Sequence, residues 1–248
     1  MRVLTDLRDA WCRSLGDGLL GLYVHGSLVA GDFAEDRSDL DVLAVLAADP
    51  DAPLLSRLAG LHADLDRRHP AWAGRIEVEY VAAAALHGPD GHLIARISPG
   101  EELHLLPATT HRLVTWATVH DSGRALAGPP AATLVPPADP AVVRAALLDH
   151  VRDWPAWVEQ MTAPGAQSYS VLTMCRAVQR LRHGRQLSKR RAADRTAETA
   201  PEWATLIGWA REWWYSGGLD SDPGRFAEVR AFVAEQSAAI LRAERKTT

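Results

Sequence analysis

The 248-residue chain is long enough for one large domain or for two domains of ordinary size. Hydrophobic residues make up 47% of the sequence and charged residues 23%, which is usual for a soluble globular protein. The formal net charge of −4 argues against a protein that binds nucleic acid over a broad basic surface.

The sequence carries no signal for membrane insertion or for a disulfide framework. No stretch approaches the roughly 20 apolar residues of a membrane helix. The N-terminal segment has acidic residues at Asp6 and Asp9 and lacks the core of a signal peptide. Cys12 and Cys175 lie in apolar helical patterns, so we expect both to be buried. We therefore expect a cytoplasmic protein without membrane contact.

The first half of the chain predicts an α/β domain. Apolar residues at helical spacing predict helices, and alternating or continuous apolar runs predict strands. The helices are expected over 2–15, from Leu54 to a point before Pro70, and over 111–120, and the strands over 19–24, 39–47 and 75–81. An irregular segment is expected from His87 to Gly100, followed by an apolar run from Leu103 to Leu106.

Residues 123–140 hold the strongest linker signal, with Gly128-Pro129-Pro130 and Pro136-Pro137. Beyond this segment the pattern is helical over about 140–160, 169–183, 189–199, 202–215 and 223–243. The predicted architecture is therefore an α/β domain with a mixed sheet over residues 1–132, followed by an all-α domain over residues 133–248.

Two aspartates mark the second predicted strand. Asp39 and Asp41 alternate with Leu40, so both carboxylates project from one face of the strand. A divalent cation relieves their repulsion, and Mg²⁺ is the natural candidate because it leaves room for water and substrate phosphates. Gly26 lets the backbone approach a phosphate closely, and Ser27 adds a hydroxyl donor. The pattern predicts a metal-and-triphosphate site, and a solvated edge-strand face is the alternative.

A second acidic pair, Glu77 and Glu79, lies on one face of the third predicted strand. A carboxylate beside a magnesium-bound triphosphate can accept the proton of an attacking hydroxyl, or it can coordinate the metal. The pattern does not decide which glutamate faces the metal. Ordinary solvent-facing residues are the alternative, above all for Glu79.

A basic cluster lies between residues 176 and 195, where Asp194 is the single acid. In a chain of net negative charge, such a cluster creates a local positive field that suits phosphate binding. Its members are Arg176, Arg180, Arg182, Arg185, Lys189, Arg190, Arg191 and Arg195. A solvated helix face or a nucleic-acid contact is the alternative, and it is favoured for Arg180, Arg182, Arg190 and Arg191.

These motifs carry a resemblance to a known family. Gly26-Ser27 followed by Ser38-Asp39-Leu40-Asp41 resembles the signature of the nucleotidyltransferase superfamily, which shares its catalytic fold with DNA polymerase β. The second half resembles the helical domain of the spectinomycin/streptomycin (aminoglycoside) adenylyltransferases, through Ser170 to Arg176, His183-Gly184-Arg185, Lys189 and Ala192-Ala193-Asp194. The similarity runs in order over nearly the whole chain.

The resemblance implies a polymerase-β-like catalytic domain, a helical domain of the adenylyltransferase type, and roles for particular residues. Asp39 and Asp41 would bind Mg²⁺, and Glu77 would be the catalytic base and a further metal ligand. The nucleotide-binding residues implied are Gly26, Ser27, Ser38, Arg176, Lys189 and Tyr215. ATP, as co-substrate, and the acceptor are expected to bind between the two domains of a monomer.

The acceptor half of the family pattern is only partly present. The family's substrate-binding tryptophan falls at or beside Glu102, and its acidic positions fall in residues 162–167, which hold no carboxylate. Glu102 and Trp157 are the weak candidates for binding the acceptor, although a tryptophan at helical spacing more often belongs to a core.

The predicted reaction is the magnesium-dependent transfer of AMP from ATP to a hydroxyl of an aminoglycoside or aminocyclitol antibiotic, which would give resistance. Another small acceptor, such as a nucleoside or lincosamide antibiotic or a biosynthetic intermediate, is one alternative. A protein or tRNA acceptor, as in toxin–antitoxin pairs, is a second, although nucleic acid is not the expected partner. A binding-only protein is a third, and the joint presence of Asp39, Asp41 and Glu77 argues against it.

Overall fold

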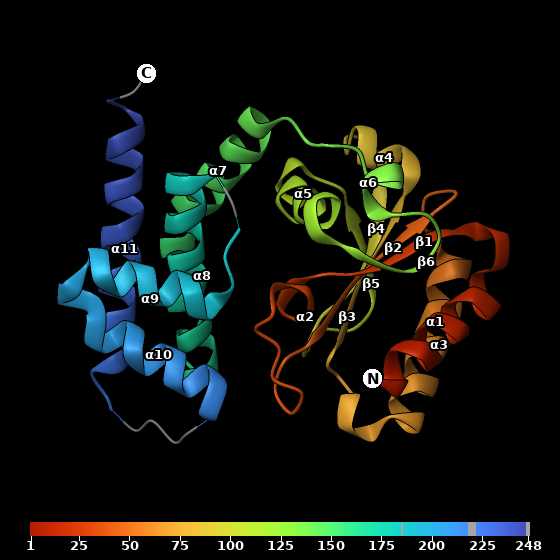
Figure 1. The fold of residues 1–248 in the computed structure, drawn as a ribbon, viewed down its shortest axis with the longest axis horizontal. Helices are drawn as coiled ribbons and strands as arrows, with labels where there is room; N and C mark the ends of the chain where they lie inside the picture. Colours follow the sequence, from red (N-terminus) through yellow and green to blue (C-terminus); the bar gives the residue numbers. More distant parts are fainter. Residues whose placement is uncertain (185, 218–221, 247–248) are drawn as a thin grey trace. The chain divides into compact units, whose positions relative to one another are not determined.

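The computed structural model describes residues 1–184, 186–217 and 222–246. It divides into two compact units, Met1–Val143 and Arg144–Thr248 (Figure 1). The division lies in the first turn of the helix α7 (Pro140–Val158), and the boundary predicted from the sequence, 132/133, falls within the short helix α6 (Ala131–Leu134). Among the described residues, no helix combines the length and the apolar character that a membrane crossing requires.

The first unit is built on a six-stranded mixed sheet of order β5-β4-β3-β2-β1-β6. Its strands are β1 (Leu19–Val24), β2 (Leu40–Leu46), β3 (Ile76–Ala82), β4 (Leu93–Ile97), β5 (His104–Pro107) and β6 (Arg124–Ala127). β2 and β3 are parallel, and every other neighbouring pair is antiparallel. The parallel pair needs a crossover, which α3 (Ala52–Arg68) supplies. The predicted mixed sheet is confirmed.

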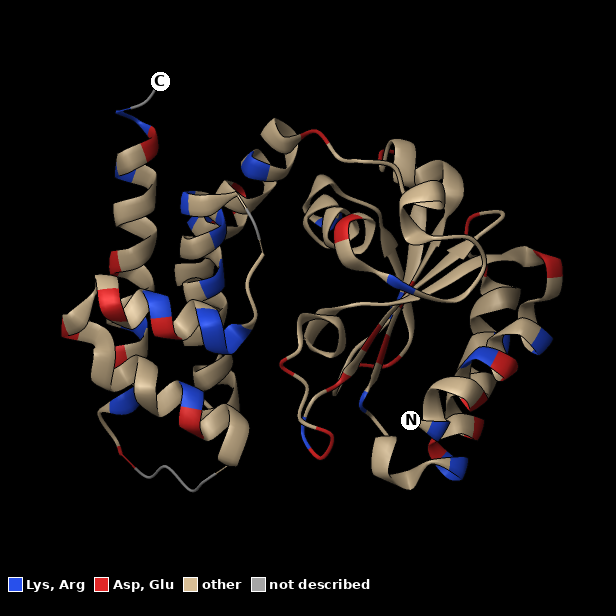
Figure 2. Ribbon diagram, in the orientation of Figure 1, with Lys and Arg blue, Asp and Glu red and all other residues tan. Residues whose placement is uncertain are grey.

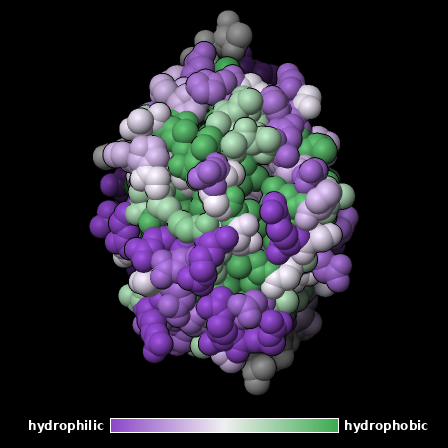
Figure 3. Space-filling model, turned by 90° about the vertical axis from the view of Figure 1, so that its right-hand side faces the viewer, coloured by the Kyte–Doolittle hydropathy of each residue, from purple (hydrophilic) through white to green (hydrophobic). Residues whose placement is uncertain are grey.

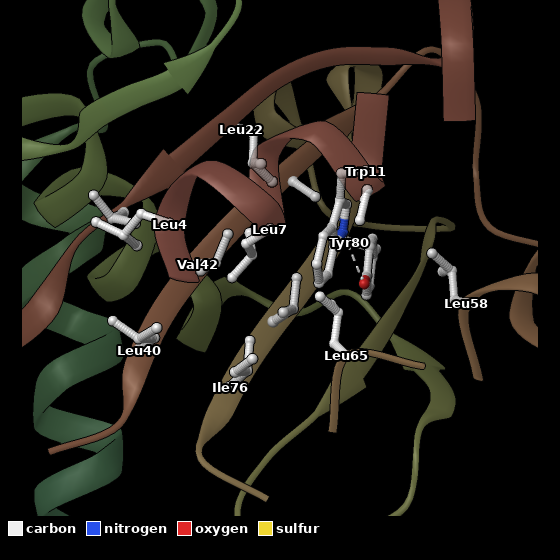
Figure 4. Packing of buried hydrophobic residues seen from close by; sticks show 14 of the residues in the cluster. Leu4, Leu7, Trp11, Leu22, Leu40, Val42, Leu58, Leu65, Ile76 and Tyr80 are labelled. Atoms are coloured by element: carbon white, nitrogen blue, oxygen red, sulfur yellow. Dashed lines mark hydrogen bonds between the residues drawn. The ribbon is translucent and has the colours of Figure 1, made fainter. Parts of the chain in front are cut away.

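Each face of the sheet has its own hydrophobic core, because side chains alternate along every strand. The helices α1 (Arg2–Leu15) and α3 contribute to the first core, together with residues such as Leu22 and Val42 (Figure 4). Short helices, α4 (Ala83–His87), α5 (Leu113–Ser122) and α6 (Ala131–Leu134), contribute to the second core, with Leu43 and Val45 of β2. The face of the molecule drawn in Figure 3 combines hydrophilic and hydrophobic residues.

A buried hydrogen-bond chain joins α1, α3 and β3 within the first core. Trp11 Nε1 donates to Tyr80 Oη over 3.0 Å, and Tyr80 Oη lies 2.8 Å from His62 Nε2. Burial lowers the pKa of His62 to about 4. The imidazole is therefore neutral at pH 7, and with its proton on Nδ1 it accepts the hydroxyl proton of Tyr80.

We expect the free energy of unfolding to fall as the pH drops from about 6.5 to 4. In this window the unfolded chain protonates His62, whereas the folded chain keeps the imidazole neutral, so the unfolded state is favoured by up to about 3 kcal/mol. Urea unfolding of the wild type and of His62→Gln at several pH values measures this contribution. The stability difference between the two proteins should shrink as the pH falls, and parallel curves would show that His62 does not carry it.

The described residues of the second unit form a helical bundle around α8 (Pro164–His183). Its other helices are α7, α9 (Lys189–Thr199), α10 (Ala204–Ser216) and α11 (Arg225–Glu244), with a 3-10 turn at Pro201–Trp203. α8 packs against α9, α10 and α11. It begins with Pro164 in its first turn, where the missing amide costs nothing, and it ends at Gly184, whose φ of 74° is left-handed. The helical prediction is confirmed, although α8 begins before residue 169.

Several local predictions need correction. The irregular segment from His87 to Gly100 contains β4, and the predicted linker 123–140 contains β6 and α6. Cys12 is exposed, because α1 turns it away from its buried neighbour Trp11. Cys175 is buried as predicted, and burial raises the pKa of its thiol to about 12.

Candidate active site

Two strands bring the predicted acidic residues together. In the parallel pair β2–β3, Asp41 lies directly opposite Glu77, so the two side chains project from the same face of the sheet. Asp39 comes two residues before Asp41, at the entry to β2, and Leu40 between them is fully buried on the opposite face. Figure 2 shows acidic residues on these neighbouring strands.

Gly26 brings the turn after β1 against the carboxylate of Asp41. The amide of His25 donates to the carbonyl oxygen of Asp41 over 3.0 Å, and Gly26 follows at a φ of +64° as the first residue of α2 (Gly26–Ala30). A Cβ at position 26 would lie 1.9 Å from Oδ2 of Asp41. Only glycine therefore lets the backbone and Ser27 pass so close to Asp41. The structure places the two halves of the predicted motif side by side.

Glu77 is held by an arginine of the next strand. Arg96 of β4 donates from Nη2 to Oε1 of Glu77 over 3.0 Å, and its Nη1 lies 3.9 Å from Oε2 of Glu101. The Glu77 side chain is 29% exposed, so its carboxylate is both oriented by protein and open to solvent. Such a carboxylate suits a general base that must reach a substrate hydroxyl.

Glu79 has a different environment. It is 7% exposed, and both carboxylate oxygens have partners: Trp116 Nε1 donates to Oε1 over 2.5 Å and Arg112 Nη1 to Oε2 over 3.3 Å. Burial raises the pKa of Glu79, although Arg112 and Trp116 favour its ionised form. These contacts join β3 to the start of α5. The geometry favours a structural role for Glu79 and leaves Glu77 as the candidate base.

The donor set fits a magnesium site that the substrate completes. Among the described residues, no three His, Cys, Asp or Glu side chains are arranged to hold a metal ion by themselves. Mg²⁺, however, usually takes one or two carboxylates and fills its remaining positions with water and phosphate oxygens. Asp39 and Asp41 supply two carboxylates, and the missing Cβ of Gly26 keeps space beside Asp41. Metal ligation by Glu77 stays a prediction.

Ser38 has a local partner in the structure. Its hydroxyl accepts a hydrogen bond from the amide of Ala34 over 3.0 Å, and its own amide donates to the carbonyl of Ala34 over 2.7 Å. The side chain is buried at 7% exposure. Ser38 therefore closes the turn that leads into Asp39, and its predicted contact with the nucleotide stays a prediction.

In the second unit, two predicted nucleotide-binding residues lie where α9 packs on α10. Nζ of Lys189 lies 3.5 Å from the ring centroid of Trp214 and 5.3 Å from that of Tyr169. The guanidinium of Arg190 lies 3.9 Å above the ring of Tyr215. These cation–π contacts orient two basic side chains at the start of α9. Arg176 lies on α8, and Arg185 falls outside the described residues.

The two weak acceptor-binding candidates lie in different units. Glu102 is exposed between β4 and β5, and its carbonyl oxygen lies 2.8 Å from Nδ1 of His104. Trp157 of α7 is 40% exposed and packs edge-on against Trp154 and His150, with centroids 5.5 and 5.0 Å away. An exposed ring in an aromatic group is available for stacking. Acceptor binding by Glu102 and Trp157 stays a prediction.

Sequence reasoning missed the basic partners of the acidic pair. Arg96 lies in β4, within the segment expected to be irregular, and Arg112 lies in the 3-10 turn Thr110–Arg112. The short apolar run Leu93-Ile94-Ala95, which Ile97 continues after Arg96, was an available signal for a strand carrying a basic side chain. The pairing of Arg112 with Glu79 had no local signal, because 33 residues separate the two.

Comparison with known proteins adds two findings. Residues 133–239 match the family model of the aminoglycoside adenylyltransferase C-terminal domain. A solved structure of spectinomycin adenyltransferase AAD(9) from Enterococcus faecialis, determined with ATP and spectinomycin, is similar with a TM-score of 0.81 and 15% sequence identity. The alignment covers 96% of this chain and 98% of that chain. No curated protein matches the sequence. The family match supports the predicted resemblance over residues 133–239, and the structural match confirms the predicted fold.

Proposed function

We propose that this chain, whose residues 133–239 match the family model of the aminoglycoside adenylyltransferase C-terminal domain, transfers AMP from ATP to a hydroxyl of an aminoglycoside or aminocyclitol antibiotic. The observation that carries the proposal is the in-register pair Asp41 and Glu77 beside the glycine turn at Gly26. This arrangement sets the carboxylate that we assign to the metal next to the candidate base. The proposal includes Mg²⁺ dependence, resistance to the antibiotic, and a cytoplasmic monomer.

The chemistry follows from the positions of the carboxylates. Glu77 accepts the proton of the acceptor hydroxyl, whose oxygen forms a bond with the α-phosphorus of ATP while the bond to the β-phosphate oxygen breaks and pyrophosphate leaves. Asp39 and Asp41 would hold Mg²⁺, which neutralises charge on the phosphates when bound. Arg96 keeps Glu77 oriented toward the hydroxyl.

The helical unit contributes the cationic groups in this proposal. Arg176 and Lys189 bind phosphate oxygens, and Tyr215 lies against the nucleotide, as the resemblance implies. The support from this chain is the basic cluster and the position of Lys189 and Tyr215 at the same packing contact of α9 with α10.

A different small acceptor is the second candidate. A polycationic aminoglycoside is best bound by carboxylates, and residues 162–167 contain none. A nucleoside or lincosamide antibiotic, or a biosynthetic intermediate, places less demand on acidic residues. The protein or tRNA acceptor is less favoured, because Arg190 packs on Tyr215 and Arg182 donates to Thr199 Oγ1 over 3.2 Å.

Incubation of the purified protein with Mg²⁺, ATP and single antibiotics tests the proposal. We expect mass spectrometry to show an aminoglycoside or aminocyclitol with the added mass of AMP, together with pyrophosphate release. Omission of Mg²⁺ is the control. Modification of a lincosamide or nucleoside alone would select the second candidate. If no pyrophosphate were released with any of these acceptors, both candidates would be contradicted.

A further inference from the structure

We propose that Arg75 is a positioning residue that fixes Asp39 for metal binding, an inference that rests on the proposed function. Arg75 immediately precedes β3 and lies outside the acidic motif. Its side chain and its backbone bond to the residues on either side of Asp39.

The guanidinium reaches three backbone carbonyls. Nη2 donates to the carbonyl oxygen of Ser38 over 2.6 Å and to that of Glu35 over 2.8 Å, while Nη1 donates to that of Ala71 over 3.0 Å. The carbonyl oxygen of Arg75 also accepts the amide of Leu40 over 2.8 Å. Asp39 is thus fixed at the peptide before it and at the peptide after it.

An aromatic stack extends this clamp to the rest of the loop. The guanidinium of Arg75 lies 4.6 Å from the ring centroid of Trp72, whose ring stacks on Phe33 at 6.1 Å and an interplanar angle of 16°. Phe33 lies in the loop between α2 and β2. The loop that delivers Asp39 is therefore attached to residues 71–75 at three places: Phe33, Glu35 and Ser38.

These contacts have a consequence for the metal site. Residues 25–27 are fixed against β2, and Asp41 and Glu77 are fixed by the sheet register. Asp39 precedes β2, and the contacts of Arg75 fix the peptides on both sides of it. A planar guanidinium can serve several carbonyls at fixed angles, which a lysine ammonium does with less geometric control. Groups that orient metal ligands typically contribute about 10- to 100-fold to metal affinity.

The test is direct titration with Mn²⁺, which binds the same kind of carboxylate oxygens as Mg²⁺. The electron paramagnetic resonance signal of Mn²⁺ reports the concentration of the free ion. We expect Arg75→Ala to weaken Mn²⁺ binding by about 10- to 100-fold, and Arg75→Lys to lie between Arg75→Ala and the wild type. Arg68→Ala is the matched control, because Arg68 is an arginine of the same unit that pairs with Asp64 on α3. Its affinity for Mn²⁺ should equal that of the wild type.

A double-mutant cycle with Asp39→Asn separates positioning from general stability. If Arg75 acts through Asp39, Arg75→Ala should cause no further loss of Mn²⁺ affinity in the Asp39→Asn protein. Thermal unfolding of each variant checks the fold, and Arg75→Lys carries the test if Arg75→Ala does not fold. The inference about Arg75 would be overturned if both Arg75 variants bound Mn²⁺ with wild-type affinity. It would also be overturned if Arg75→Ala lowered the Mn²⁺ affinity of the Asp39→Asn protein as much as that of the wild type. Absence of Mn²⁺ binding by the wild type both with and without ATP would overturn it together with the metal assignment, whereas a missing AMP product with Mn²⁺ binding intact would affect only the proposed reaction.

Discussion

Asp41→Asn should abolish AMP transfer and leave the fold intact. The amide is nearly isosteric, so the close approach of Gly26 and the sheet register are preserved, but the negative charge that would bind Mg²⁺ is lost. Loss of this electrostatic stabilisation should lower kcat/KM by at least about a thousandfold, or about 4 kcal/mol in the transition state. Single-turnover assays with radiolabelled ATP would measure the remaining rate.

Asp49→Asn is the matched control for this change. Asp49 follows β2 at the end of the strand opposite to Asp41, and its carboxylate pairs with Nδ1 of His92 at 2.8 Å. Its variant should keep wild-type turnover. Activity in Asp41→Asn with an unchanged unfolding midpoint would remove Asp41 from the metal site.

The sequence was informative wherever one short segment decides the structure. The alternation of Asp39, Leu40 and Asp41 predicts which side chains share a face, because the period of a strand is two. The same argument predicts that Glu77 and Glu79 share a face. α1 was predicted with its observed bounds, because its apolar residues repeat at helical spacing and Gly16 ends it.

Features that depend on pairing across the sheet could not be read from the chain. The register that sets Asp41 opposite Glu77 joins strands separated by α3, and strand pairing has no signal within either strand alone. The same limit applies to Glu79. Its burial beneath Trp116 and Arg112 reflects the docking of α5 on the sheet. Two glutamates of equal sequence pattern thus acquire opposite environments.

β4 shows how flanking residues can hide an element. Glycines and prolines on both sides of Leu93–Ile97 indicate loops, and they led to the expectation of an irregular segment. Tertiary pairing with β3 and β5 nevertheless forms the strand. Missing β4 also meant missing Arg96, the residue that orients the candidate base.

Glu77→Gln and Glu79→Gln should separate catalysis from stability. Glutamine at position 77 can still accept the hydrogen bond of Arg96 but cannot take a proton from the acceptor, so turnover should fall by roughly two to four orders of magnitude at an unchanged unfolding midpoint. Glutamine at position 79 leaves the partly buried Arg112 without its anionic partner, so it should lower the unfolding midpoint and change turnover by less than about tenfold. Calorimetric titration with ATP and Mg²⁺ should show that Glu77→Gln retains nucleotide binding, which distinguishes loss of a base from loss of substrate binding.

If Glu79→Gln instead lost turnover and Glu77→Gln remained active, the proton would have to leave through the carboxylate beneath α5. That result would require α5 to move from the sheet during the reaction, because Trp116 and Arg112 otherwise hold both oxygens of Glu79.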